Sequence, residues 1–179
     1  MKKTILVTGG TGFIGSHTTV ELQNAGYDVV IVDNLSNSQA DVVDGIEKIT
    51  GIRPAFEEVD CGDLAGLEAV FQKYPGIQGI IHFAASKAVG ESVEKPLMYY
   101  ENNLLSLINL LKLMPKYDVK GIIFSSSCTV YGQPDPENLP VTEEAPIKKA
   151  ESPYGNTKQI NEEIVQDYVK SGAPISAIL

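Results

Sequence analysis

The chain has 179 residues, enough for one domain with a sizeable core and barely enough for two. Its formal net charge of −9, with scattered lysines and arginines, argues against a partner that is a nucleic acid or a membrane surface. The first apolar run stops at Gly9-Gly10, too early for a signal peptide or a membrane span, and the two cysteines suit a reducing compartment. We therefore expect a cytoplasmic protein. The two histidines lack partners at metal-ligand spacing, so no metal site is expected.

The first third of the chain alternates between strand-like and helix-like stretches. A β-branched run at Thr4–Thr8 predicts a strand, and Phe13–Ala25 has helical spacing. Asp28–Val32 is a second apolar strand. A predicted helix at Gln39–Ile49 and a weaker strand at Pro54–Val59 follow.

The alternation continues through the middle of the chain. Leu64–Tyr74 predicts a helix and Gly79–Phe83 a fourth strand. Pro96–Met114 is a long apolar helix that we expect Pro115 to end, and Lys120–Ser125 is a fifth strand.

The last third begins with a segment without periodicity, Gly132–Ala150, which predicts a surface loop that could also contact a ligand. Ser152–Lys170 predicts a helix with a proline in its first turn, and Ile175–Leu179 a sixth strand. Strands alternating with helices imply βαβ units, so the predicted fold class is α/β, a Rossmann-like doubly wound parallel sheet with flanking helices.

A glycine-rich turn directly follows the first strand. Gly9, Gly12 and Gly15 have a G-x-x-G-x-x-G spacing. Glycines let the backbone bend sharply and approach a nucleotide pyrophosphate, and the N–H groups that begin the next helix point at the anion. A tight βα turn without a ligand has the same pattern, so the other strand ends must decide between the two interpretations.

Acidic residues close the second and third strands. Asp33 can accept hydrogen bonds from an adenosine ribose and would repel a 2′-phosphate, so it favours NAD over NADP. Asn34, Asn37 and Ser38 offer polar groups beside the same ribose. Asp60 could hold an adenine amino group, or it could equally cap the next helix.

Small residues follow the fourth strand. Phe83, Ala84 and Ala85 would let a cofactor lie across the edge of the sheet. Lys87 is a basic residue where phosphates would lie, or else an ordinary surface lysine. His82 points the other way by strand alternation, and we expect it to be structural.

The strongest chemical signal comes late in the chain. The triplet Ser125–Ser127 ends the fifth strand, where its hydroxyls could bind a substrate oxygen or merely cap the sheet. Tyr154 and Lys158, at i and i+4, share one helical face. An adjacent ammonium favours the phenolate, so Tyr154 is a candidate general base toward a sugar hydroxyl. Two exposed helix residues could have this spacing, but the serine triplet and the glycine turn favour catalysis.

These segments resemble the extended short-chain dehydrogenase/reductase family, and within it the UDP-glucose 4-epimerase branch. The resemblance runs along essentially the whole chain. Lys87–Ser92, followed by Pro96, is close to diagnostic of that branch. The segments that carry the resemblance are Val7–His17, Asp33–Ser38, His82–Ala85, Lys87–Ser92, Tyr99–Asn103, Phe124–Gly132 and Ser152–Lys158.

The resemblance implies an isomerase of galactose metabolism that uses NAD to invert C4 of a UDP-sugar substrate, UDP-glucose or UDP-galactose. Tyr154 would deprotonate the 4-hydroxyl while C4 gives a hydride to NAD, and the 4-keto sugar would rotate and take the hydride back. Ser127 would bind the 4-oxygen, Thr129 would touch the sugar, and Lys158 would bind the nicotinamide ribose and tune Tyr154. The implied cofactor-binding residues are Gly9, Gly12, Phe13, Ile14, Gly15, Asp33, Asn34, Asn37, Ser38, Asp60, Cys61, Phe83, Ala84, Ala85, Lys87, Asn102, Tyr154 and Lys158.

The chain departs from the family in two places along its length and in its extent. Leu104–Leu107 stands where an Asn-x-Gly-Thr-like segment is usual, and Cys128 stands where alanine is common. Family members are much longer, so we expect 1–179 to be an incomplete NAD-binding Rossmann domain, truncated at the sixth strand, without the C-terminal substrate domain. We expect this chain to bind NAD weakly and to epimerise poorly or not at all, and the longer parent to be a homodimer.

Three alternatives remain. A nucleotide-sugar 4,6-dehydratase would place an acid pair after Thr129, where this chain has Val130-Tyr131. A non-catalytic NAD-binding module is a second alternative, and the complete set of Ser127, Tyr154 and Lys158 argues against it for the parent. Self-association through exposed core surface is the third.

Overall fold

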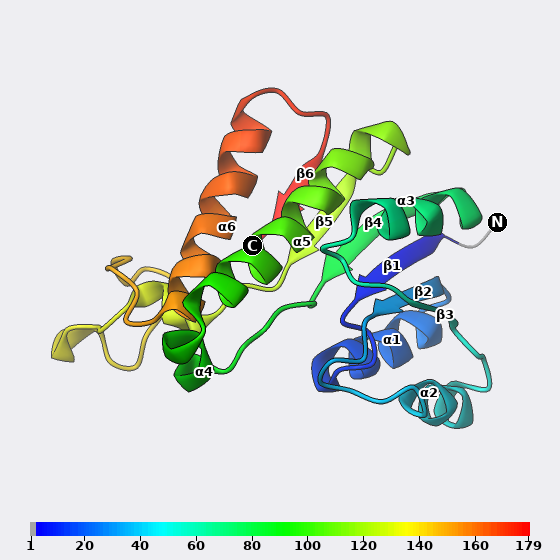
Figure 1. The fold of residues 1–179 in the computed structure, drawn as a ribbon, viewed down its shortest axis with the longest axis horizontal. Coiled ribbons are helices and arrows are strands. Elements are labelled where there is room, and N and C mark those ends of the chain that lie inside the picture. Colours follow the sequence, from blue (N-terminus) through cyan, green and yellow to red (C-terminus); the bar gives the residue numbers. More distant parts are fainter. Residues whose placement is uncertain (1–2) are drawn as a thin grey trace.

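The computed structural model describes residues 3–179, and its centre is a six-stranded parallel sheet in the order β3-β2-β1-β4-β5-β6 (Figure 1). The order runs outward in both directions from the central pair β1 and β4, which is the point where doubly wound sheets bind ligands at their carboxyl edge. The strands are β1 (Thr4–Thr8), β2 (Asp28–Asp33), β3 (Ala55–Glu58), β4 (Ile77–His82), β5 (Gly121–Phe124) and β6 (Ser176–Ile178).

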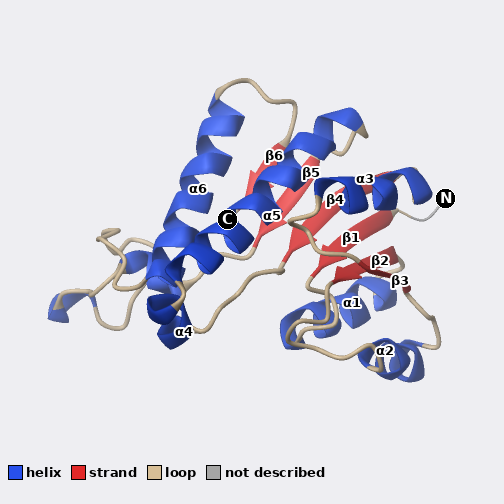
Figure 2. Cartoon of the chain, viewed as in Figure 1, coloured by secondary structure: helices blue, strands red, loops and turns tan. Residues whose placement is uncertain are grey.

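Helices cover the sheet in layers. In Figure 2, α1 and α2 lie on one side of the strands, and α3, α5 and α6 lie on the other. The helices are α1 (Phe13–Asn24), α2 (Val42–Thr50), α3 (Leu64–Lys73), α4 (Val89–Glu94), α5 (Pro96–Lys116) and α6 (Pro153–Lys170), with short 3-10 helices η1 (Cys128–Tyr131) and η2 (Pro136–Asn138).

Alternation along the strands gives the sheet two unequal cores. Leu6 and Val30 belong to the larger buried cluster, which α3, α5 and α6 complete with residues such as Leu107. Their neighbours Val7 and Ile31 belong to a smaller cluster under α1 and α2. Because both faces are covered, the central strands β1 and β2 carry continuous apolar runs and show no period-2 pattern.

The predicted doubly wound α/β fold is confirmed, with corrections to three elements. The helix expected at Gln39–Ile49 begins only at Val42, because tight turns occupy the residues before it, where the Val42 N–H donates to the Gln39 carbonyl at 3.3 Å. Pro115 does not end α5, which continues to Lys116. The proline lies in the last turn, and the Tyr117 N–H still closes that turn on the Leu113 carbonyl at 3.0 Å.

The third correction is α4, which the sequence did not predict. It is a short helix within and just after the Lys87–Ser92 segment, and its end is held by an ion pair between Lys95 and Glu91 at 3.0 Å. Its partner is Tyr99 on α5, a fully buried ring whose hydroxyl donates to Glu91 at 2.9 Å and accepts from the Ala88 N–H at 3.0 Å. A loop-like sequence is therefore ordered by one buried tyrosine.

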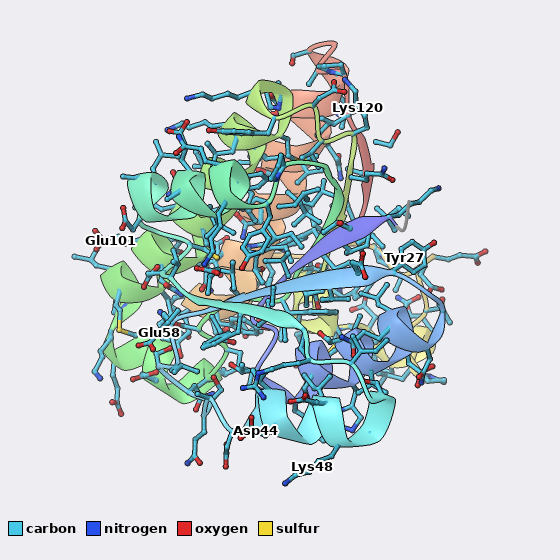
Figure 3. All side chains as sticks on the ribbon, turned by 90° about the vertical axis from the view of Figure 1, so that its right-hand side faces the viewer. Tyr27, Asp44, Lys48, Glu58, Glu101 and Lys120 are labelled. Atoms are coloured by element: carbon cyan, nitrogen blue, oxygen red, sulfur yellow. The ribbon has the colours of Figure 1, made fainter. Side chains whose placement is uncertain are left out.

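Several charged side chains of the helices face solvent. Asp44 and Lys48 on α2 and Glu101 on α5 point away from the molecule in Figure 3. Across residues 3–179, no helix is long and apolar enough to cross a membrane.

Candidate active site

The glycine turn connects β1 to α1 by backbone packing that excludes side chains. Gly9 has φ +68°, and a Cβ there would lie 2.8 Å from the Ala84 nitrogen at the end of β4. A Cβ on Gly15 would lie 2.2 Å from the Gly9 carbonyl oxygen. Gly12 caps α1 without any side-chain hydrogen bond, and the first turn of α1 contains no acidic residue. The helix therefore presents N–H groups and a positive dipole end without a competing carboxylate.

Asp33 is tied directly to this turn. Its Oδ2 accepts a hydrogen bond from the Thr11 N–H at 3.2 Å. Its Oδ1 accepts from the Leu35 N–H at 3.0 Å and from the Ser38 hydroxyl at 3.2 Å. Leu35 has φ +57°, a conformation that is uncommon for residues with a Cβ, so the chain bends tightly around the carboxylate. The predicted pyrophosphate turn and the predicted ribose acid are thus one hydrogen-bonded unit.

The acid after β3 belongs to the same edge. Asp60 accepts from the Asn34 side-chain amide at 2.8 Å and from the Gly62 N–H at 2.7 Å. The turn that carries it is held from α5, because the buried Asn109 donates to the carbonyls of Cys61 at 3.0 Å and Gly62 at 2.9 Å. Burial raises the pKa of Cys61 to about 12, with Asp60 adding to the effect, so this thiol stays protonated at neutral pH.

The end of β4 is supported from below by His82. The ring is buried, and its Nδ1 lies 2.6 Å from the Thr8 hydroxyl at the end of β1. Burial lowers its pKa to about 3, with the nearby Lys158 charge adding to the effect, so the ring is neutral. The structural role expected for this histidine is confirmed. Its partners lie far away in sequence and were not predicted.

Asn103 on α5 holds the segment that follows β4. Its side-chain oxygen accepts from the Ser86 N–H at 2.8 Å, and its amide donates to the Ser86 carbonyl at 2.9 Å and to Thr157 on α6 at 3.0 Å. Asn161 donates from α6 to the Asn103 carbonyl at 3.0 Å. The predicted cofactor residue Asn102 lies beside it and donates to the Ser86 hydroxyl at 3.1 Å. One buried asparagine therefore fixes β4, α5 and α6 relative to one another.

Lys158 is a buried lysine on α6, with 4% of its surface exposed. Its ammonium donates to the Ser125 carbonyl at 2.6 Å and lies 4.6 Å from the centre of the Phe124 ring. Burial lowers the pKa of Lys158 to about 8, and the charge of Glu162 opposes that shift. The end of β5 and the face of α6 are therefore joined at the predicted catalytic lysine.

The other two predicted catalytic residues lie on adjoining segments. Ser127 caps η1, where its hydroxyl oxygen accepts hydrogen bonds from the Thr129 hydroxyl at 3.0 Å and the Thr129 N–H at 3.3 Å. Gly155, next to Tyr154, packs so closely that a Cβ there would lie 3.2 Å from the Thr129 Cβ. Ser152 caps α6 through the Gly155 N–H at 3.1 Å. Thus η1 and the first turn of α6 are in contact, and the side chains of Ser127 and Tyr154 are both partly exposed.

Other predicted cofactor residues lie at the surface. Phe13 and Ile14 are 77% and 57% exposed at the start of α1, so any contact they make with a cofactor would lie on the surface. Asn37 and Lys87 are likewise exposed. Within residues 3–179, no group of three or more His, Cys, Asp or Glu side chains could hold a metal ion.

Several residues at the site escaped prediction. Asn103, Thr157 and Glu162 contribute hydrogen bonds around the predicted catalytic set, and Glu162 accepts its hydrogen bond from Ser126, a member of the predicted serine triplet. Glu162 had a signal in the sequence, because it lies one further helical turn from Lys158 on the face that the lysine shares with Tyr154. The asparagine and threonine had none, since their partners come from distant elements.

Known sequences similar to this chain point to one family. A family model described as the NAD dependent epimerase/dehydratase family matches residues 5–179. The UDP-glucose 4-epimerase of Schizosaccharomyces pombe is 49% identical over 178 residues, which are 98% of this chain and 50% of that protein. The UDP-glucose 4-epimerase of Bacillus subtilis is 52% identical over 163 residues, which are 91% of this chain and 47% of that protein. The chain spans about half the length of the curated relatives it matches.

Solved structures agree in fold. The UDP-glucose 4-epimerase from Bifidobacterium longum in complex with NAD+ and UDP is similar with a TM-score of 0.93 at 48% identity, covering 98% of this chain and 51% of that one. The enzyme from Stenotrophomonas maltophila with bound NAD and formylated UDP-arabinopyranose is similar with a TM-score of 0.91 at 44% identity, covering 98% and 51%.

Proposed function

The chain belongs to the NAD dependent epimerase/dehydratase family, and we propose that it forms the cofactor-binding and proton-transferring part of an enzyme that inverts C4 of a UDP-hexose. UDP-glucose and UDP-galactose are the proposed pair, which would place the enzyme in galactose metabolism. The proposal is carried by the convergence, at one edge of the sheet, of an uncapped glycine turn, the acid Asp33, and the set of Ser127, Tyr154 and Lys158.

The residues present fit NAD. The glycine turn would admit a pyrophosphate at the start of α1, where a Cβ would collide with the backbone. Asp33 would accept hydrogen bonds from the hydroxyls of the adenosine ribose and would repel a 2′-phosphate. Asp60 would accept from the adenine amino group while Asn34 and Gly62 hold its carboxylate in place. When bound, NAD would take a hydride from C4 of the sugar and return it to the opposite face.

The proton would be handled by α6 and η1. Tyr154 is the proposed base that takes the proton of the 4-hydroxyl and later returns it. Lys158, still mostly protonated at neutral pH, would stabilise the phenolate from below. Ser127 would donate its hydroxyl to the sugar 4-oxygen, since that hydroxyl already accepts from Thr129 and retains its own hydrogen for donation.

Binding of the dinucleotide is the first test. Titration of the chain with NAD and with NADP, followed by calorimetry, is expected to show binding of NAD and weaker binding of NADP. Asp33→Ala is expected to lower the affinity for NAD by about tenfold or more, because a charged acceptor is lost. Glu58→Ala is the matched control, since Glu58 is an exposed acid paired in register with Asp33 on the next strand. Equal affinities for NAD and NADP would contradict the assignment.

Turnover is the second test. Incubation of the NAD-loaded chain with UDP-galactose, followed by NMR of the sugar, measures epimerisation, and we expect the 179-residue chain to be slow at best. Any rate present is expected to fall by about 10²-fold or more in Tyr154→Phe, since the general base is removed. A rate that Tyr154→Phe leaves unchanged would overturn the role of this tyrosine.

We also propose that the whole protein is a homodimer. Apolar side chains on the outer side of α5 support this, because Leu97, Met98 and Leu105 are exposed by 81%, 40% and 40%. Light scattering on the purified protein measures the mass directly, and a monomer at all concentrations would refute the proposal.

A further inference from the structure

The serine triplet at the end of β5 sends three groups to three different partners. The Ser125 carbonyl accepts from the ammonium of Lys158 at 2.6 Å. The Ser126 hydroxyl donates to Oε1 of Glu162. The Ser127 hydroxyl accepts from Thr129 at the other side of the segment. Two consecutive residues that follow β5 therefore hold Lys158 and Glu162, which lie one turn apart on α6.

Glu162 is oriented by this contact. The residue is partly buried, and the hydroxyl of Ser126 directs its carboxylate toward the sheet. The next residue, Glu163, is exposed. A carboxylate held only for solubility would be expected to point to solvent as Glu163 does, so the inward direction of Glu162 requires another explanation.

The surroundings of Lys158 supply that explanation. The ring of Phe124 comes from β5 and the Ser125 carbonyl from the residue after it, while the neutral His82 comes from β4 and Glu162 from α6 itself. A lysine buried among such groups loses hydration, which favours its neutral form. Among the described groups that act on Lys158, Glu162 supplies the negative charge that favours the ammonium.

We propose that Glu162, clamped by Ser126, is a positioning residue that keeps Lys158 charged and aligned inside the protein. Tyr154, Lys158 and Glu162 then lie along one face of α6, at i, i+4 and i+8. Glu162 acts on the proposed base Tyr154 through Lys158. The consequence for catalysis rests on the proposed function, because a charged Lys158 matters only if Tyr154 transfers the sugar proton. The effect on Lys158 itself does not depend on any cofactor or substrate.

The test is a direct titration of the lysine in the free chain. The chain is labelled with carbon-13 at lysine Cε, and its NMR signals are followed against pH, with Lys158→Arg identifying the signal. Glu162→Gln keeps a hydrogen-bond acceptor for Ser126 and removes the charge. We expect the pKa of Lys158 to fall below about 8, so that the neutral fraction near pH 7, about a tenth in wild type, rises by several fold. Glu163→Gln is the matched control and is expected to leave the titration unchanged.

A second variant separates the clamp from the charge. Ser126→Ala retains the carboxylate but frees it to turn toward solvent, so its effect on Lys158 is expected in the same direction and smaller. If Glu162→Gln fails to fold by circular dichroism, Ser126→Ala and Glu162→Asp are used for the same measurement. A Lys158 titration that is the same in wild type and in the folded variants would overturn the proposal.

The result is independent of the proposed function. If the Lys158 titration depends on Glu162 but the chain does not bind NAD, the positioning role of Glu162 is supported and the epimerase assignment is rejected. Binding of NAD with a Lys158 titration insensitive to Glu162 would do the reverse. Where turnover is measurable, its pH profile in Glu162→Gln is expected to shift toward lower pH on the alkaline side, because Lys158 then loses its proton earlier.

Discussion

The edge of the sheet at β1 and β2 is built from backbone, whereas the edge at β4, β5 and α6 is built from side chains. In the first region, Gly9 and Gly15 pack against backbone atoms, and backbone N–H groups hold Asp33. In the second, Asn103 and Lys158 bridge elements through their own side-chain atoms, and both are buried. The two regions meet where Gly9 approaches Ala84.

The difference predicts how each region responds to change. A backbone cradle has no room for an added methyl group, but it loses little when one side-chain donor is removed. A side-chain network tolerates changes in its surroundings, but it leaves buried groups unpaired when one member is truncated. Four substitutions test this contrast, taken from the largest expected effect to the smallest.

Gly15→Ala is expected to be the most damaging. Its Cβ would lie 2.2 Å from the Gly9 carbonyl oxygen, so the turn or α1 must move, at a cost of about 3 kcal/mol of unfolding free energy. Urea denaturation measures the loss. The control is Gly45→Ala in α2, where a Cβ meets no atom within 4 Å and a gain of about 0.5–1 kcal/mol is expected. Similar effects of the two substitutions would end the contrast.

Asn103→Ala tests the side-chain region. The Ser86 backbone and the Thr157 hydroxyl would each lose a partner in a buried setting, so we expect a loss of about 2–3 kcal/mol by urea denaturation. Asn24→Ala, at the exposed end of α1, should change the stability little. A small effect at Asn103 would mean that the helices hold this region without the network.

His82→Gln tests the neutral imidazole through pH. The pKa is about 3 in the folded chain and about 6.5 in the unfolded chain, so below 6.5 only the unfolded chain takes up this proton. The stability contribution is complete above pH 6.5 and is lost as pH falls toward 3. From about pH 7.5 to about pH 5, wild type should lose about 2 kcal/mol more than His82→Gln. Urea denaturation at both pH values, with exposed His17→Gln as the control, measures it.

Ser38→Ala is expected to have the smallest effect. It removes one donor to Asp33, while the N–H groups of Thr11 and Leu35 remain. The affinity for NAD should fall by about fivefold or less, a loss of about 1 kcal/mol. Calorimetry checks this. A loss as large as that of Asp33→Ala would show that side chains hold the cradle after all.

The same contrast explains what the sequence could predict. The glycine spacing, Asp33 at a strand end, and the pair Tyr154 and Lys158 are local patterns, so sequence alone placed them at one edge of a parallel sheet. Their placement at that edge is confirmed by the structure. Their chemical roles remain proposals.

The missed features depend on distant partners. Asn103 meets Ser86 and Thr157, and Ser126 meets Glu162, across separate elements whose packing no local pattern encodes. The short helix α4 was missed because its order comes from a buried tyrosine on α5. Pro115 was given too much weight, since a proline in the last turn costs a helix little beyond it.

Two asparagines of helix α5 hold two different loops, and their separation along the helix fixes the distance between those loops. Asn103 holds the loop after β4, and Asn109 holds the turn after β3. Six residues of helix separate them, a rise of about 9 Å. Because both asparagines belong to one rigid helix, the loop after β4 and the turn after β3 keep a fixed spacing. One residue inserted between Asn103 and Asn109 would rotate one of them about the helix axis by about 100°, so that α5 could hold only one of the two segments.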